Sequence, residues 1–177
     1  MKKITLILLV LCSLNGNAQD SIPKFQVTPD GIAPIVLQLN SMAVSDIYKK
    51  TLNYVQEYYK NPKEVLKADI PNELVRINGF KKEAWAQKLP MTPIFYYDMD
   101  YTLEIEMKEN KVRLSLTPNQ FWAGDIKGNF TVKDFFLDTK AAKKFAEQAK
   151  PGLENAINEI SQGYYNYLKG LVKKDNW

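Results

Sequence analysis

The sequence contains no histidine, and its single cysteine, Cys12, lies within the first eighteen residues. Without histidine, a Ser-His or Cys-His catalytic pair is excluded, and the imidazole ligands that many transition-metal sites use are missing. Arginine is scarce as well, because Arg76 and Arg113 are the only two. Arginine is the side chain best suited to bidentate recognition of phosphate and carboxylate, so a dedicated anion-binding face is not expected.

Long apolar runs are also absent. The stretch from Ile4 to Cys12 is too short to span a bilayer, and no later stretch approaches ~20 apolar residues. This run has the form of a secretory signal peptide, because Lys2 and Lys3 precede it and Gly16-Asn17-Ala18 supplies small residues for cleavage. Lipidation at Cys12 is the alternative, but a lipidation signal places a small residue directly before the cysteine, where this chain has Leu11.

We therefore expect a signal peptide over residues 1–18, cleavage after Ala18, and a single mature domain over residues 19–177 in the periplasm or outside a bacterial cell. Lys2 and Lys3 belong to the leader, so the formal net charge falls from +4 to +2. This near balance gives no footprint for nucleic acid. No motif indicates a cofactor or a metal, and we expect neither.

The most regular pattern of the mature chain is a strict alternation from Tyr97 to Met107. Apolar side chains occupy the odd positions, and Asp98, Asp100, Thr102, Glu104 and Glu106 occupy the even ones. Such a period of two predicts a half-buried antiparallel strand. Glu109-Asn110 can turn the chain, and the alternation then resumes from Val112 to Thr117, which predicts a hairpin.

Other strands are predicted from shorter patterns. The chain is expected to be extended from Phe25 to Leu39, with a turn at Thr28-Pro29-Asp30-Gly31. The segment from Leu74 to Phe80 is typical of a strand, in which Gly79 would ease a bulge or a bend. Residues 63–69 are expected to form a further turn of helix.

Two main helices are predicted. The first is capped by Ser45 and ends near Lys60. After a short helix that Asp138 or Thr139 caps and that ends near Ala149, the last helix has Pro151 in its first turn. It carries an apolar stripe that contains Gly163, and we expect a crowded contact at this glycine.

This order of strand, helix, several antiparallel strands and helix predicts an α+β fold with a sheet of about five strands. Each helix has one apolar stripe and the sheet has one apolar face, so both main helices are expected to pack on one side. The polar face would then stay open to solvent or to a partner.

Four features together form a family pattern: the leader, the helix that begins Ser45-Asp46-Ile47-Tyr48, the segment Val75-Arg76-Ile77-Asn78-Gly79, and the Tyr97–Thr117 hairpin followed by the C-terminal helix. They resemble secreted bacterial domains of unknown function with a TATA-box-binding-protein-like (TBP-like) fold. The resemblance covers roughly Phe25 to Leu171 and implies a curved antiparallel sheet with helices on one face. It implies no functional residues, because the family has no agreed activity.

DNA binding does not follow from this fold name, because function depends on a site and not on a fold. The acidic side chains of the predicted open face repel phosphate. The candidate binding face consists of charged residues on three strands: Arg76, Asp98, Asp100, Glu104, Glu106 and Arg113.

The acidic row has three interpretations. Neighbours two apart on a strand lie ~6.6–7 Å from each other, a spacing that suits an inverting glycosidase. Such a row could also bind calcium, although no loop of the required pattern is present. The simplest interpretation is a solvated sheet face on which Lys111 and Arg113 relieve the repulsion between acids. Trp85 and Trp122 could form a sugar or peptide platform, but core or rim packing is the simpler interpretation for such large rings.

We therefore expect a non-catalytic binding module for a protein, peptide or glycan of the bacterial envelope. The absence of a recognisable catalytic arrangement and the open sheet face motivate this hypothesis. Two alternatives stay open at this point: a carboxylate-dependent glycan hydrolase that uses two of the four acids, and a structural module that self-associates through the open face or an edge strand.

Overall fold

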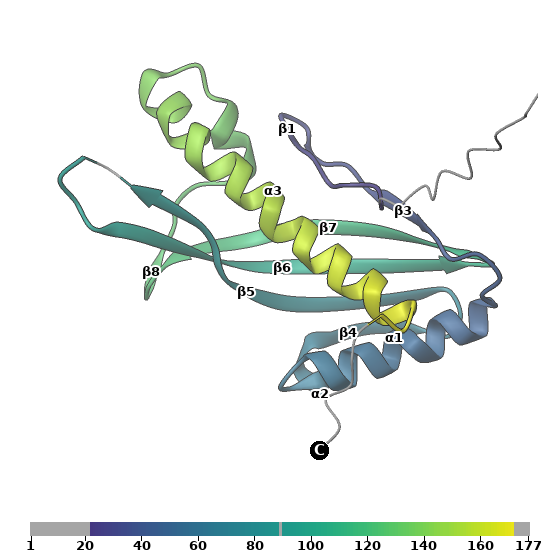
Figure 1. Cartoon of the computed structure of the whole chain (residues 1–177). Helices are drawn as coiled ribbons and strands as arrows, with labels where there is room; N and C mark the ends of the chain where they lie inside the picture. The colour runs from purple at the N-terminus through teal and green to yellow at the C-terminus, as the bar shows by residue number, and fades with distance from the viewer. Residues whose placement is uncertain (1–21, 89, 172–177) are drawn as a thin grey trace, which may run out of the picture.

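The computed structural model of the chain describes residues 22–88 and 90–171 (Figure 1). The predicted signal peptide and its cleavage site lie outside the described residues. The helices and strands are β1 (Val27–Thr28), β2 (Gly31–Ile32), β3 (Ile35–Gln38), α1 (Val44–Tyr58), α2 (Pro62–Val65), β4 (Leu66–Ile70), β5 (Leu74–Lys88), β6 (Ile94–Lys108), β7 (Lys111–Ala123), β8 (Ile126–Lys127), the 3₁₀ helix η1 (Val132–Phe136) and α3 (Lys140–Leu168).

Six strands form one antiparallel sheet in the order β3-β7-β6-β5-β4, and β8 pairs with the end of β7. The first two strands form a separate small hairpin at the predicted Thr28–Gly31 turn. The main sheet is larger than the expected five strands, but the α+β class and the antiparallel arrangement are confirmed.

The hairpin of β6 and β7 forms as predicted, with Lys108 opposite Lys111 and Asn110 in the left-handed region that such turns use. This turn also fixes the start of α1. The Asn110 side chain accepts a hydrogen bond from the Met42 N–H, and Glu109 accepts one from the Val44 N–H. The predicted cap at Ser45 is therefore wrong, because α1 begins at Val44 and a carboxylate from the hairpin caps it instead.

β5 is longer than predicted, because it continues beyond Phe80 to Lys88. The bulge expected near Gly79 lies further along, between Lys81 and Trp85, where Glu83 has a positive φ of 52°. Gly79 has another role. It lies directly opposite Tyr101, and a Cβ at this position would be 2.3 Å from the Tyr101 ring, so only glycine leaves room for that ring.

The helical turn expected over residues 63–69 is only partly present. α2 covers Pro62–Val65, and the chain then enters the edge strand β4, which pairs with β5. β4 has no fully buried residue, so no strong apolar alternation marks it in the sequence.

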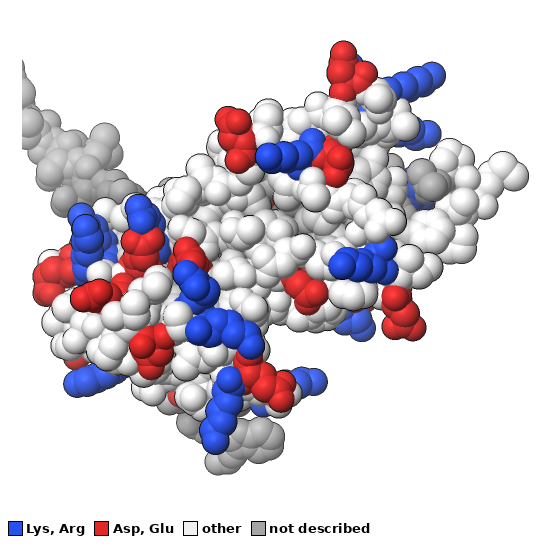
Figure 2. Space-filling view, turned by 180° about the vertical axis from the view of Figure 1, so that it is seen from behind, with Lys and Arg blue, Asp and Glu red and all other residues white. Residues whose placement is uncertain are grey.

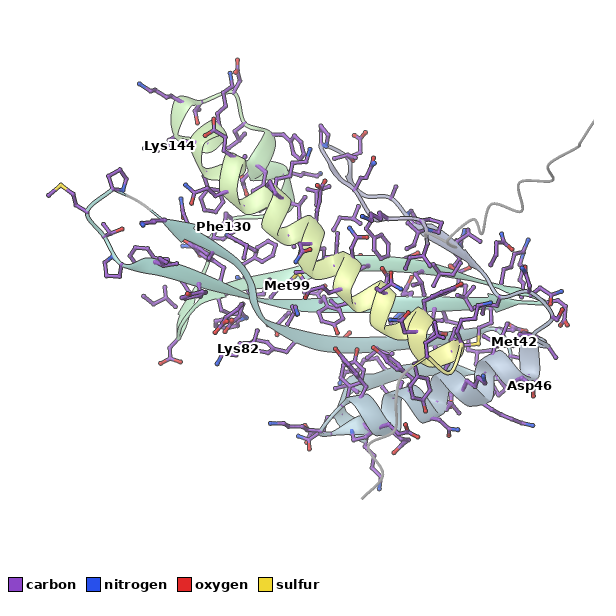
Figure 3. All side chains as sticks on the ribbon, viewed as in Figure 1. Met42, Asp46, Lys82, Met99, Phe130 and Lys144 are labelled. Atoms are coloured by element: carbon purple, nitrogen blue, oxygen red, sulfur yellow. The ribbon has the colours of Figure 1, made fainter. Side chains whose placement is uncertain are left out.

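Both main helices cover the same face of the sheet, as predicted. α3 crosses the sheet diagonally and α1 lies beside its β4 edge (Figure 1). The core between them contains the odd-numbered residues of β6, such as Met99, Leu103 and Ile105, all 0% exposed. In Figure 3, Met99 and Phe130 lie on the side of α3, whereas Lys82 points into solvent.

α3 is a single helix of 29 residues with Pro151 in its interior, where the sequence predicts two helices. The cap at Thr139 is confirmed, because the Thr139 hydroxyl accepts a hydrogen bond of 3.1 Å from the Ala142 N–H. The crowded contact expected at Gly163 is wrong, since a Cβ there would meet nothing within 4 Å. Within α3 the crowded glycine is instead Gly152, where a Cβ would lie 2.4 Å from the Trp85 Cβ.

Side chains of α3 hold the first described segment along the helix by hydrogen bonds to the backbone of Phe25 and Val27. The Asn158 side-chain oxygen accepts from the Phe25 N–H at 2.8 Å, and its amide nitrogen donates to the Phe25 carbonyl at 3.0 Å. One turn earlier on the helix, Glu154 accepts from the Val27 N–H at 2.9 Å. An extended segment with few strand partners of its own thus obtains its backbone hydrogen bonds from a helix.

Candidate functional site

The open face is the side of the main sheet that α1 and α3 leave uncovered. It is built by alternation, because the even-numbered residues of β6 point away from the helices. Figure 2 views the molecule from behind and shows charges of both signs intermingled over the surface, with no large area of one sign. The structure brings all six predicted residues of the candidate binding face together on β5, β6 and β7.

Each arginine of the candidate binding face pairs with the glutamate directly opposite it. Arg76 donates to Glu104 with an Nε–Oε1 distance of 2.6 Å. Arg113 donates to Glu106 through its Nε at 3.0 Å and through its Nη2 to both carboxylate oxygens. These side chains are between 33% and 53% exposed, so the pairs order the surface more than they stabilise the fold.

The two aspartates are held by N–H donors instead. Asp98 accepts a hydrogen bond of 2.7 Å from the Glu83 N–H at the β5 bulge. Asp100 accepts one of 2.7 Å from the Trp122 indole N–H. All four carboxylates of the candidate binding face therefore have a hydrogen-bond partner within the fold.

Between these charged pairs lies a neutral row that sequence reasoning did not include. Asn119 donates to the Thr102 hydroxyl at 2.9 Å, and this hydroxyl donates to the Asn78 side-chain oxygen at 3.0 Å. Phe80 is next to it on β5, opposite Asp100, and is 55% exposed. Alternation in β5 already places Asn78 and Phe80 on the same face as Arg76. Asn119 lies at a register shift of β7, between Pro118 and Gln120, that the sequence does not reveal.

A hollow indents one end of the open face. This hollow of about 240 Å³ lies where β3 meets the β6–β7 turn, and it is lined by Val36, Glu106, Lys108, Lys111 and Arg113. Within residues 22–88 and 90–171, no group of three or more acidic side chains converges as metal ligands would. In the same ranges, no helix combines the length and the apolar character needed to cross a bilayer.

Trp85 and Trp122 differ in position. Trp85 is only 3% exposed, stacks on Tyr97 with a centroid distance of 4.9 Å, and belongs to the core, as the simpler interpretation predicted. Trp122 is partly exposed and donates to Asp100 from the open face. A ligand platform on this face can therefore use Trp122 and Phe80 but not Trp85.

The opposite, helix-covered side holds a cluster of tyrosines. The Tyr59 and Tyr101 hydroxyls share a hydrogen bond of 2.9 Å, and Tyr164 shares one of 2.7 Å with Thr51. Burial raises the pKa of Tyr59, Tyr101 and Tyr164 well above the ordinary value of 10. Tyr167 has its pKa raised to about 12, first by desolvation and then by Glu57. These hydroxyls stay protonated and serve packing.

The sheet, its helix-covered face and its exposed polar face define an α+β protein with a TBP-like fold. Residues 35–122 match the family model described as "Domain of unknown function (DUF4468) with TBP-like fold". The chain belongs to this family, which confirms the resemblance that the sequence analysis identified.

Two solved structures support the fold. A DUF4468 family protein from Bacteroides ovatus is 12% identical, with a TM-score of 0.55 over 88% of this chain and 93% of that one. A TBP-like protein from Parabacteroides distasonis is 8% identical, with a TM-score of 0.54 over 77% of this chain and 91% of that one. The comparison with curated proteins finds no match.

Proposed function

We propose that this protein is a non-catalytic binding module of the bacterial envelope that binds a protein, peptide or glycan through the open face. The observation that carries the proposal is the open face itself. Helices cover only one side of the main sheet, and cross-strand hydrogen bonds hold the polar side chains of the other side in place. A surface ordered before binding loses less side-chain entropy when a partner arrives.

The chemistry of the open face supports binding over hydrolysis. A glycosidase needs one carboxyl group to donate a proton and a second to act as base or nucleophile. Here Glu104 and Glu106 are bonded to arginines, and Asp98 and Asp100 accept bonds from N–H donors. Of the four carboxylates, Glu106 alone lines the hollow of about 240 Å³ on this face, so no pair of acids faces a substrate across it.

The envelope location is proposed from the leader pattern between Lys2 and Ala18. A mature chain without cysteine is compatible with that location, because its stability does not depend on the redox state of the compartment.

Site-specific photo-crosslinking in the native bacterium tests the face. A photoreactive amino acid at Ser115, in the middle of the open face, should give a cross-linked product. The same group at Asn53, on the exposed side of α1, should give none. A second protein carries both the photoreactive group at Ser115 and the substitution Thr102→Arg. It should give no cross-linked product, because Thr102→Arg breaks the hydrogen-bonded row of Asn78, Thr102 and Asn119.

Binding of the labelled mature chain to a panel of glycans tests for a partner that is not a protein. Binding should again be lost in Thr102→Arg, while the matched variant Asn53→Arg adds the same charge elsewhere and should bind normally. Cross-linked products that arise only from the Asn53 position would contradict the proposal. So would a result in which the Ser115 position gives no cross-linked product and the panel retains no glycan.

A further inference from the structure

The outer part of the β5–β6 hairpin extends beyond the rest of the main sheet (Figure 1). β5 and β6 remain paired out to Lys88 opposite Ile94, whereas β6 and β7 begin to pair only at Asp98 opposite Trp122. Among the described residues, the segment Ile94–Tyr97 of β6 therefore has a partner strand on one side only. Its other side is a free strand edge.

The two edges of this hairpin differ in whether a side chain hydrogen-bonds their free backbone groups. On the β5 edge, the Gln148 side chain of α3 accepts from the Lys88 N–H at 2.8 Å and donates to the Lys88 carbonyl at 3.2 Å. This amide occupies the place that a neighbouring strand would take. No side chain does the same for Ile94–Tyr97 among the described residues, so the fold closes one edge and leaves the other open.

Within Ile94–Tyr97 the open edge carries no charged side chain and no bulge. Natural edge strands carry charges, bulges or inward-pointing polar residues that keep other strands away. Ile94, Phe95 and Tyr96 are 46%, 43% and 50% exposed, and the chain has no charged residue from Pro90 to Tyr97. Three large apolar side chains thus remain in solvent beside free backbone groups.

Tyr97, at the inner end of the edge, is packed on β5. Tyr97 stacks on the buried Trp85 at 4.9 Å, and the Tyr97 hydroxyl donates to Gln87 at 3.2 Å. These contacts fix the Tyr97 side chain on β5 at the inner end of the free edge.

We propose that Ile94–Tyr96 is a homodimerisation edge, at which β6 of a second copy of this chain pairs antiparallel about a twofold axis. Residues directly opposite each other in an antiparallel pair lie on the same face of the sheet, so the axis must pass through a residue position. Centring it on Phe95 places Phe95 opposite Phe95 of the partner subunit, and Ile94 opposite Tyr96 of the partner subunit. Every cross-strand pair is then apolar, with aromatic rings that favour such pairing.

The free backbone groups favour a strand over other occupants. A bilayer offers no hydrogen bonds to exposed N–H and C=O groups, so lipid would leave this edge unsatisfied. A second copy supplies both the backbone partners and matching apolar side chains, with no charge on either strand to repel the other. This inference is independent of the open-face proposal, because it concerns the rim of the sheet and not its polar face.

The mature chain has no cysteine, so one engineered cysteine tests the register directly. In Phe95→Cys the two introduced residues lie opposite each other at about 4.5–5.5 Å, within reach of a disulfide. In the matched control Tyr96→Cys they are diagonal neighbours about 7–8 Å apart, beyond disulfide range. Mild oxidation of the folded chain should therefore cross-link Phe95→Cys at least about tenfold faster than Tyr96→Cys.

Sedimentation over a range of concentrations gives a second readout. The wild-type chain should shift from monomer to dimer as its concentration rises, Phe95→Lys should stay monomeric, and Ile126→Lys, at another exposed apolar residue, should behave as wild type. A wild-type chain that is monomeric throughout, equal cross-linking of the two cysteine variants, or occupation of the edge by a strand of a different protein would overturn the proposal.

Discussion

Tyr54 has a buried hydroxyl group without a hydrogen-bond partner among the described residues. The residue is 1% exposed, and its ring contacts Tyr58 at 4.9 Å and Tyr164 at 5.2 Å between centroids. The ring therefore contributes packing, whereas the hydroxyl loses its hydration on folding and gains nothing in return. Burial of an unpaired hydroxyl costs about 1–3 kcal/mol.

We predict that Tyr54→Phe leaves the free energy of unfolding unchanged or raises it by up to about 1 kcal/mol. The substitution keeps the ring contacts and removes only the unpaired polar atom. Urea denaturation of the mature chain measures the change. A loss of more than about 1 kcal/mol would show that the hydroxyl has a partner after all, such as an enclosed water molecule.

Tyr164→Phe is the matched control, because its hydroxyl is equally buried but shares a 2.7 Å hydrogen bond with Thr51. That substitution removes the bond to Thr51, whose hydroxyl still donates to the Ile47 carbonyl, and should lower the free energy of unfolding by about 1 kcal/mol.

α3 shows how tertiary packing overrides a local stop signal. Pro151 has no N–H, so the Glu147 carbonyl loses its helical donor, which normally costs about 3 kcal/mol in a helix interior. Ala149 and Leu153 are nevertheless buried on either side of it, at 1% and 0% exposure. Proline alone therefore predicts a helix start, and only the contacts with the sheet reveal one continuous helix.

The two glycines of α3 provide a paired prediction. Gly163→Ala should raise the free energy of unfolding by about 0.5–1 kcal/mol, because alanine is the better helix former and its Cβ meets nothing within 4 Å. Gly152→Ala should lower it by about 1–3 kcal/mol, because the new Cβ would lie 2.4 Å from that of Trp85. Thermal or urea unfolding measures both, and a stabilising Gly152→Ala would contradict the packing of α3 on β5.

The regularity of apolar and polar alternation decides how well each strand is predicted from the sequence. β6 keeps its period of two from Tyr97 to Met107, so the sequence predicts this part of the strand and its open face. In β5 the run Lys81-Lys82-Glu83 at the bulge breaks the alternation. The sequence pattern therefore does not predict the second half of this strand. β4 is short and has no fully buried residue, so a helical turn was the natural interpretation.

For the molecule as a whole, the sequence predicts which side chains share the open face but not how they pair. Alternation places Arg76, Glu104 and Glu106 together, and the predicted hairpin brings Arg113 across from Glu106. The bond from Trp122 to Asp100 depends on a register shift in β7 near Pro118, which no local pattern specifies. The free edge at Ile94–Tyr97 likewise follows only from strand lengths that tertiary structure sets.

The tyrosine cluster predicts sensitivity to alkali. Burial raises the pKa of Tyr54, Tyr59, Tyr101 and Tyr164 in the folded chain above the value of 10 expected when unfolded. Stability from these groups is fully present below pH 10 and is lost as the pH rises above it. Each tyrosine that must stay protonated costs about 1.4 kcal/mol per pH unit above that point.

Urea denaturation between about pH 8 and about pH 11 should therefore show a falling free energy of unfolding only beyond pH 10. Tyr164→Phe removes one buried tyrosine and should flatten that fall. Ultraviolet absorbance of tyrosinate gives a direct check, and titration of all ten tyrosines near pH 10 in the folded chain would contradict the prediction.

The attachment of Phe25 to Asn158 joins residues 133 positions apart. During synthesis, the N-terminal segment cannot acquire these backbone partners until nearly all of the remaining chain has left the ribosome. The N-terminal segment of the nascent protein therefore stays without these hydrogen bonds until late in synthesis. It is attached to the fold only when α3 has been made.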